Sequence, residues 1–105
     1  MTSITRLHDA VAQAAPAALP AFTHELCQAA DQALHSADLL PLRRLAAQWA
    51  VHVHIQRDPG TAAGYRELED LAVASDDPDE ARGAVAELGR ILDAAHAAVA
   101  HDEVT

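Results

Sequence analysis

Lysine is absent from this chain of 105 residues, and cysteine, tryptophan, tyrosine and phenylalanine occur once each. A single cysteine excludes an internal disulfide, and nothing in the cysteine usage points to secretion. No apolar run approaches the roughly 20 residues that a membrane-spanning helix requires. We therefore expect a soluble cytoplasmic protein that makes no contact with a membrane.

Positive charge is also scarce, and the acidic residues gather in the second half. Residues 1–57 carry four acids and four arginines, whereas residues 58–105 carry twelve acids and three arginines, which is the whole formal charge of −9. An acidic surface repels polyanions and attracts basic partners. Arg43-Arg44 is the only adjacent basic pair. We therefore expect no direct binding of nucleic acid, which needs a wider positive surface.

Alanine accounts for 26 residues and thus for much of the apolar half of the composition. Alanine favours the helix but adds little volume to a core. The length is that of one domain, and we assign residues 1–105 to a single helical domain. Its core should be thin, with helices approaching closely on alanine-rich faces.

Apolar residues spaced by three and four predict five amphipathic helices. Their expected ranges are 3–15, 20–36, 39–56, 59–73 and 78–101. Asp58 and Asp77 each precede a proline and should cap the fourth and fifth helices, with Glu80 completing a capping box; Asp38 should cap the third. The fold predicted is all-α, a compact bundle of four to five helices.

The centre of this bundle should be Trp49. We expect the second, third and fifth helices to pack through Phe22, Leu26, Leu42, Leu45, Trp49, Val85, Leu88 and Leu92. Residues 51–55 alternate apolar and polar side chains, which is also typical of a strand. Because no other segment offers a partner strand, we predict a helix whose Val51 and Ile55 lie opposite Leu42 and Trp49.

The fifth helix has the most regular apolar stripe. It runs through Ala81, Val85, Leu88, Leu92, Ala95 and Val99, in alternating steps of four and three. This pattern is typical of a helix within a bundle and also of a seam with a second copy or a partner. Two and a half heptads are too few to distinguish the two.

Motifs for metal binding or catalysis are incomplete. His24-Glu25 begins a zinc-protease helix motif, but Gln28 stands where the second histidine is required. His52 and His54 lie about 160° apart on a helix and cannot share a metal there. His24 and Cys27 supply two ligands, whereas a structural zinc takes four. We therefore predict no catalytic residue, no metal ligand, no cofactor and no enzymatic activity, and we interpret Cys27 as a small buried apolar residue.

One stretch resembles a family. Phe22-x-x-Glu25, Asp38-Leu39-x-Pro41, Trp49 and Asp58-Pro59 are similar to motifs of small actinobacterial helical proteins of unknown function, over about residues 20–62. Ala50 follows Trp49 where that pattern often has a second tryptophan. Some of those proteins lie near toxin–antitoxin-like genes, so the resemblance implies a helical, antitoxin-like interaction protein.

Together these observations predict a non-enzymatic, antitoxin-like or regulatory module that presents an acidic helical face to a basic protein. The residues expected to bind this partner are Glu67, Glu69, Asp70, Asp79, Glu80 and Glu87. Charges would steer the encounter, and apolar anchors would hold the complex. Two alternatives stay open: a bundle that binds a metal or small molecule through His24, His35, His52 or Cys27, and a structural homodimer formed through the fifth helix.

Overall fold

The computed structural model describes the backbone of residues 4–104 and the side chains of residues 4–101. Within this range the fold is all-α and contains no strand, as predicted. Its elements are α1 (Ile4–Ala14), a short 3-10 helix (Pro16–Ala18), α2 (Leu19–Ser36), α3 (Leu40–Gln56), α4 (Pro59–Ala74) and α5 (Pro78–Val104). The helical assignment of residues 51–55 is confirmed, and the predicted ends lie close to the observed ones.

The chain forms two compact units, one up to Val53 and the other from His54 onward. Helix α3 crosses the boundary between them. This boundary lies a few residues before position 58, where the sequence changes from neutral to acidic. We describe each unit by itself.

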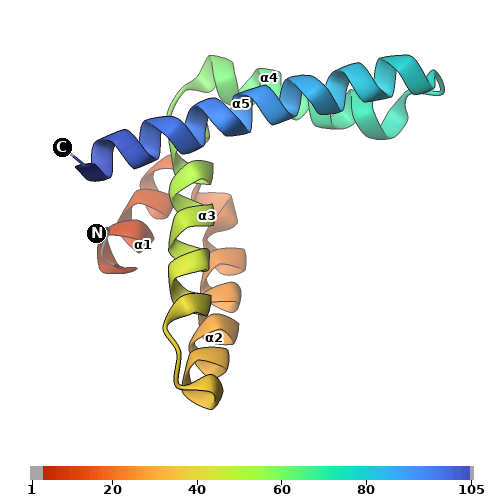
Figure 1. Ribbon diagram of the computed structural model, residues 1–105. Helices are drawn as coiled ribbons and strands as arrows, with labels where there is room; N and C mark the ends of the chain where they lie inside the picture. The colour runs from red at the N-terminus through yellow and green to blue at the C-terminus, as the bar shows by residue number, and fades with distance from the viewer. Residues whose placement is uncertain (1–3, 105) are drawn as a thin grey trace. The chain divides into compact units, whose positions relative to one another are not determined.

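The first unit is built around Trp49 and Phe22, which lie edge to face with ring centroids 5.3 Å apart. Figure 1 shows α2 and α3 running side by side in opposite directions. The buried side chains of this core are Leu7, Val11, Phe22, Ala29, Leu45, Trp49 and Val53. Leu26 and Leu42 pack against it while half-buried. The core predicted for α2 and α3 is therefore confirmed.

The turn between α2 and α3 is fixed by one left-handed residue and one side-chain cap. Ala37 ends α2 in the left-handed conformation, with φ at 54°. Asp38 then accepts a hydrogen bond from the backbone N–H of Leu40, 3.0 Å away, and thereby caps α3 as predicted. The turn is therefore tied to both helices and holds the side chains around it in fixed places.

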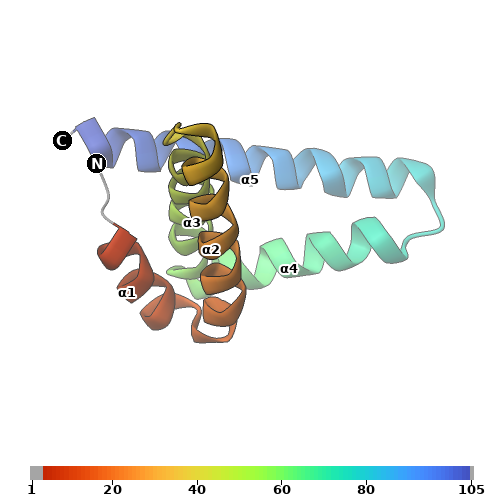
Figure 2. The ribbon, with the colours of Figure 1, turned by 90° about the horizontal axis from the view of Figure 1, so that it is seen from below.

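The second unit is a hairpin of α4 and α5, joined by residues 75–77. Figure 2 shows the two helices running side by side in opposite directions. Between α4 and His101 only two apolar side chains are buried, Ala84 and Ala95. Larger side chains stay half-buried, namely Tyr65, Leu68, Leu88, Ile91, Leu92 and Val99. The hairpin is thus the thin, alanine-lined part of the fold that the composition predicts.

One predicted core position of this hairpin is wrong. Val85 is 58% exposed, and the buried residue beside it is Ala84. Neighbouring residues point about 100° apart on a helix, so only one of the two can face inward. On α4 the half-buried residue is Ala72, whereas Leu71 is exposed. The smaller residue occupies the inner position in both helices, which lets them approach closely.

Aspartates start the second unit's helices as predicted. Asp58 accepts hydrogen bonds from the backbone N–H of Gly60 (3.1 Å) and from the hydroxyl of Thr61 (2.8 Å). Asp77 accepts one from the N–H of Asp79, 2.9 Å away. The N–H of Asp77 donates to the hydroxyl of Ser75 rather than to Glu80. The predicted cap at Asp77 is therefore present, but Glu80 does not complete a capping box.

The cap at Asp58 predicts a specific acid sensitivity. Hydrogen bonds from Thr61 and Gly60 hold the pKa of Asp58 below its ordinary value of 3.8. Because the folded pKa is the lower one, the stabilisation is complete above the ordinary value and is lost as pH falls through the lowered pKa. We expect Asp58→Ala to lower the melting temperature at neutral pH, whereas Asp58→Asn should retain most of the cap.

Thermal melts followed by circular dichroism test this expectation. The wild type should exceed Asp58→Asn in melting temperature by more at neutral pH than at about pH 3, which lies below the ordinary pKa of 3.8 that the carboxyl group has in the unfolded chain. Equal melting temperatures of wild type and Asp58→Ala at neutral pH would show that the cap does not stabilise α4.

Candidate interaction surface on the fourth and fifth helices

All six acidic residues predicted to bind a partner are exposed. Three lie on α4 and three on α5, so the hairpin carries the whole set. They are Glu67, Glu69 and Asp70 on α4, and Asp79, Glu80 and Glu87 on α5. The structure therefore leaves every one of these carboxylates accessible to a partner.

The six do not share one face. Glu67 and Asp70 lie one turn apart on α4, and Glu80 and Glu87 lie two turns apart along the same side of α5. Glu69 is two residues from Glu67 and therefore points about 200° away from it. The acidic groups thus surround the hairpin, and a partner that meets one side contacts some of them only.

Ion pairs within the hairpin neutralise two of the six. Asp79 pairs with Arg82, and Glu87 pairs with Arg90, each one turn further along α5. Exposed pairs of this kind contribute little to stability. Among the residues with described side chains, Glu67, Glu69, Asp70 and Glu80 have no such partner. No ion pair with a described side chain therefore occupies these four carboxylates.

Sequence reasoning missed three exposed apolar side chains on the same two helices. Val73 is 89% exposed, Val85 is 58% exposed and Leu71 is 38% exposed. We call this part of the hairpin the acidic turn and define it as Glu67, Asp70, Leu71, Val73, Asp76, Glu80 and Val85. Exposed apolar side chains accompanied by charged ones are typical of a binding surface. The sequence could have indicated the exposure of Val73, because Val73 directly follows Ala72, which faces α5, and therefore points in another direction.

Tyr65 reports on the electrostatics of the same hairpin. Its side chain is half-buried, and its pKa is raised from 10.0, first by loss of solvation and then by the negative charge of Glu69. The phenol therefore stays neutral at physiological pH. It contributes packing and a hydroxyl group, and no charge, to the acidic hairpin.

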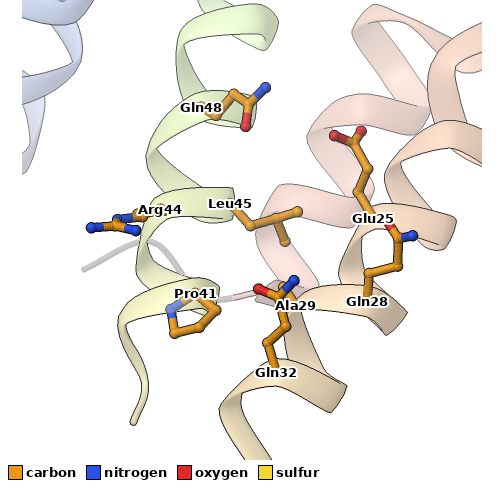
Figure 3. A pocket seen from close by; sticks show the side chains of 8 residues that line it. All are labelled: Glu25, Gln28, Ala29, Gln32, Pro41, Arg44, Leu45 and Gln48. Atoms are coloured by element: carbon orange, nitrogen blue, oxygen red, sulfur yellow. The ribbon is translucent and has the colours of Figure 1, made fainter. Parts of the chain in front are cut away.

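The first unit has a shallow groove between α2 and α3, with a volume of about 220 Å³. Its lining residues are Glu25, Gln28, Ala29, Gln32, Pro41, Arg44, Leu45 and Gln48. Figure 3 shows Leu45 reaching toward α2, while the Arg44 side chain points away from α2. Ligand pockets are usually larger than about 300 Å³ and mostly apolar. No histidine, cysteine, serine or threonine is among the residues that line this small polar groove.

The residues offered for a metal or small-molecule site do not lie in the core. His24, His35 and Cys27 are exposed, and His52 is half-buried. The interpretation of Cys27 as a buried residue is therefore wrong, because its side of α2 faces solvent together with Leu34. His35 contacts the backbone carbonyl of Asp31 through Nδ1, at 2.8 Å. Across the described residues, no group of three histidine, cysteine or acidic side chains could hold a metal ion.

No family model matches the chain, and no curated protein or solved structure is significantly similar to it. The family resemblance of residues 20–62 stays a prediction. Among the described helices, none has the length and apolar character to cross a membrane. The case for a function therefore depends on the geometry of the hairpin.

Proposed function

We propose that this chain is a non-enzymatic protein-interaction module whose acidic turn binds a basic partner protein. Its role would be antitoxin-like or regulatory, because a protein that covers a cationic surface prevents that surface from acting elsewhere. The main support is the exposure of Val73 and Val85 on the same two helices that carry the exposed carboxylates of Glu67, Asp70 and Glu80.

The two kinds of side chain serve different steps of binding. Carboxylates attract a cationic surface from a distance and raise the rate of encounter, and this effect weakens as salt is added. Apolar side chains that become buried supply most of the energy that holds a complex together. The acidic turn offers both within a short stretch of α4 and α5, which suits a partner with arginine or lysine side chains around an apolar centre.

Affinity capture with matched variants tests this proposal. The chain would be immobilised and exposed to a lysate of the organism that carries the gene, and the bound proteins measured by quantitative mass spectrometry. Glu67→Gln/Asp70→Asn/Glu80→Gln removes three charges from the acidic turn. Its control, Asp9→Asn/Glu25→Gln/Asp31→Asn, removes three charges from the first unit and leaves the acidic turn intact.

We expect a basic protein that the wild type and the control capture equally and that the acidic-turn variant loses by at least tenfold. Capture should fall in the same way when the ionic strength rises from about 0.05 M to about 0.5 M. A captured protein that binds both triple variants equally, or binds unchanged in high salt, would show that the acidic turn is not the binding surface.

A further inference from the structure

The exposed large apolar side chains of the described residues lie at two places only. Three lie at the acidic turn, and the other three surround the turn between α2 and α3, where Leu34, Leu39 and Leu40 are 80%, 59% and 41% exposed. Single exposed leucines are common on protein surfaces, but three exposed leucines around one turn make a candidate contact surface. With the side chains of residues 4–101 described, all three stay exposed.

Charge distinguishes this second patch from the first. Arg43 and Arg44 lie near the start of α3, three and four residues after Leu40, and both are exposed. Neither makes an ion pair with the acids whose side chains are described. The nearest acid in sequence, Asp38, already accepts the hydrogen bond that caps α3. We call Leu34, Leu39, Leu40, Arg43 and Arg44 the leucine turn.

We propose that the leucine turn of one copy docks on the acidic turn of a second copy. The two surfaces match in both respects: each has three exposed apolar side chains, one has two unpaired guanidinium groups, and the other has unpaired carboxylates. The inference rests on the proposed function, because it names the leucine turn of a second copy as one basic, apolar surface that the acidic turn binds. An interface made of two different surfaces is heterologous, so a dimer still has one free leucine turn and one free acidic turn, and association continues until the assembly closes.

The high net charge does not prevent this contact. Two copies with a charge of −9 repel each other at long range, but screening limits that repulsion to about 8 Å at physiological ionic strength. Inside the interface, the arginines of one copy would lie within contact distance of the acids of the other. Burial of the leucines and valines would supply the attraction that does not depend on salt.

Variants that disable one surface at a time test this proposal. Leu34→Ser/Leu39→Ser removes the apolar part of the leucine turn and leaves the acidic turn intact. Val73→Ser/Val85→Ser does the reverse. All four side chains are mostly exposed, so the substitutions should leave the fold unchanged, which circular dichroism would verify. Mass in solution would be measured by light scattering across a range of protein concentrations.

We expect the wild type to exceed the monomer mass of 11.1 kDa as its concentration rises, and each double variant to remain a monomer. An equimolar mixture of the two variants should reach twice the monomer mass and no more, because one intact leucine turn meets one intact acidic turn. Arg43→Glu/Arg44→Glu should abolish association of the wild type, and adding Asp76→Arg/Glu80→Arg to the same chain should restore it.

A wild type that stays monomeric at millimolar concentration would overturn the proposal, and so would a mixture of the double variants that stays monomeric. Association that persists in either double variant would also overturn it, since the interface would then lie elsewhere. If the wild type stays monomeric but still captures a basic protein through Glu67, Asp70 and Glu80, self-association is contradicted and the proposed function is not. Self-association without any captured protein would contradict the proposed function alone.

Discussion

Replacing Trp49 by alanine is expected to lower the free energy of unfolding by about 3–5 kcal/mol, which is a large part of the stability of a small domain. Trp49 is only 7% exposed, and its ring packs edge to face against that of Phe22. The other buried side chains of this core are all smaller than the indole ring, and each already occupies its own place in the core. Urea unfolding followed by circular dichroism would measure the loss.

Trp49→Phe separates packing from polarity at the same position. The indole N–H of Trp49 is buried and finds no acceptor among the described residues. A buried donor without a partner costs about 1–3 kcal/mol, so phenylalanine removes this cost while it loses part of the packing. We expect a clearly smaller loss of stability for Trp49→Phe than for Trp49→Ala. Equal losses would show that the unpaired N–H does not matter, and an unchanged melting temperature for Trp49→Ala would contradict the core itself.

Ala84→Leu should destabilise the hairpin of α4 and α5 by about 1–3 kcal/mol, because a larger side chain does not fit where helices approach on alanine. Ala84 is 3% exposed, and it is one of only two buried side chains in α5 up to His101. To accept leucine, α4 and α5 would have to separate and expose the half-buried Leu68 and Leu88. The melting temperature and hydrogen exchange of α4 amides would both report this change.

Ala86→Leu is the matched control, since Ala86 lies on the same helix two residues further and is exposed. Leucine is a good helix former, so this variant should keep the wild-type stability to within about 0.5 kcal/mol. If Ala84→Leu were as stable as Ala86→Leu, the close approach of the two helices at Ala84 would be wrong.

The helices could be predicted because several local signals agree. Prolines and aspartates mark where α4 and α5 begin, and the spacing of Leu45, Trp49 and Val53 fixes the inner face of α3. Residues 51–55 alternate apolar and polar side chains as a strand does, but a helix is predicted because no other segment could pair with them. These signals act within a few residues of each other and therefore need no knowledge of the three-dimensional contacts.

The inner stripe of α5 could not be predicted in full, because alanine makes it ambiguous. Ala84 and Val85 both fit a three-four spacing from Ala81 and Leu88, and hydrophobicity favours valine. Close packing of α4 and α5 favours the smaller side chain, so Ala84 is buried and Val85 is exposed. The exposure of Val73 and Leu34 was missed for a related reason. Periodicity predicts that apolar residues are buried, and it cannot identify the apolar residues that stay exposed.

Carbodiimide coupling tests the central claim most directly, because this chain has no lysine. The reagent joins carboxylates to amines at zero length. Each link that joins this chain to a lysine of a captured basic partner must therefore start at a carboxylate of this chain. The account predicts links at Glu67, Asp70, Asp76 and Glu80 of the acidic turn. Links confined to Asp9, Glu25 and Asp31 of the first unit would contradict it.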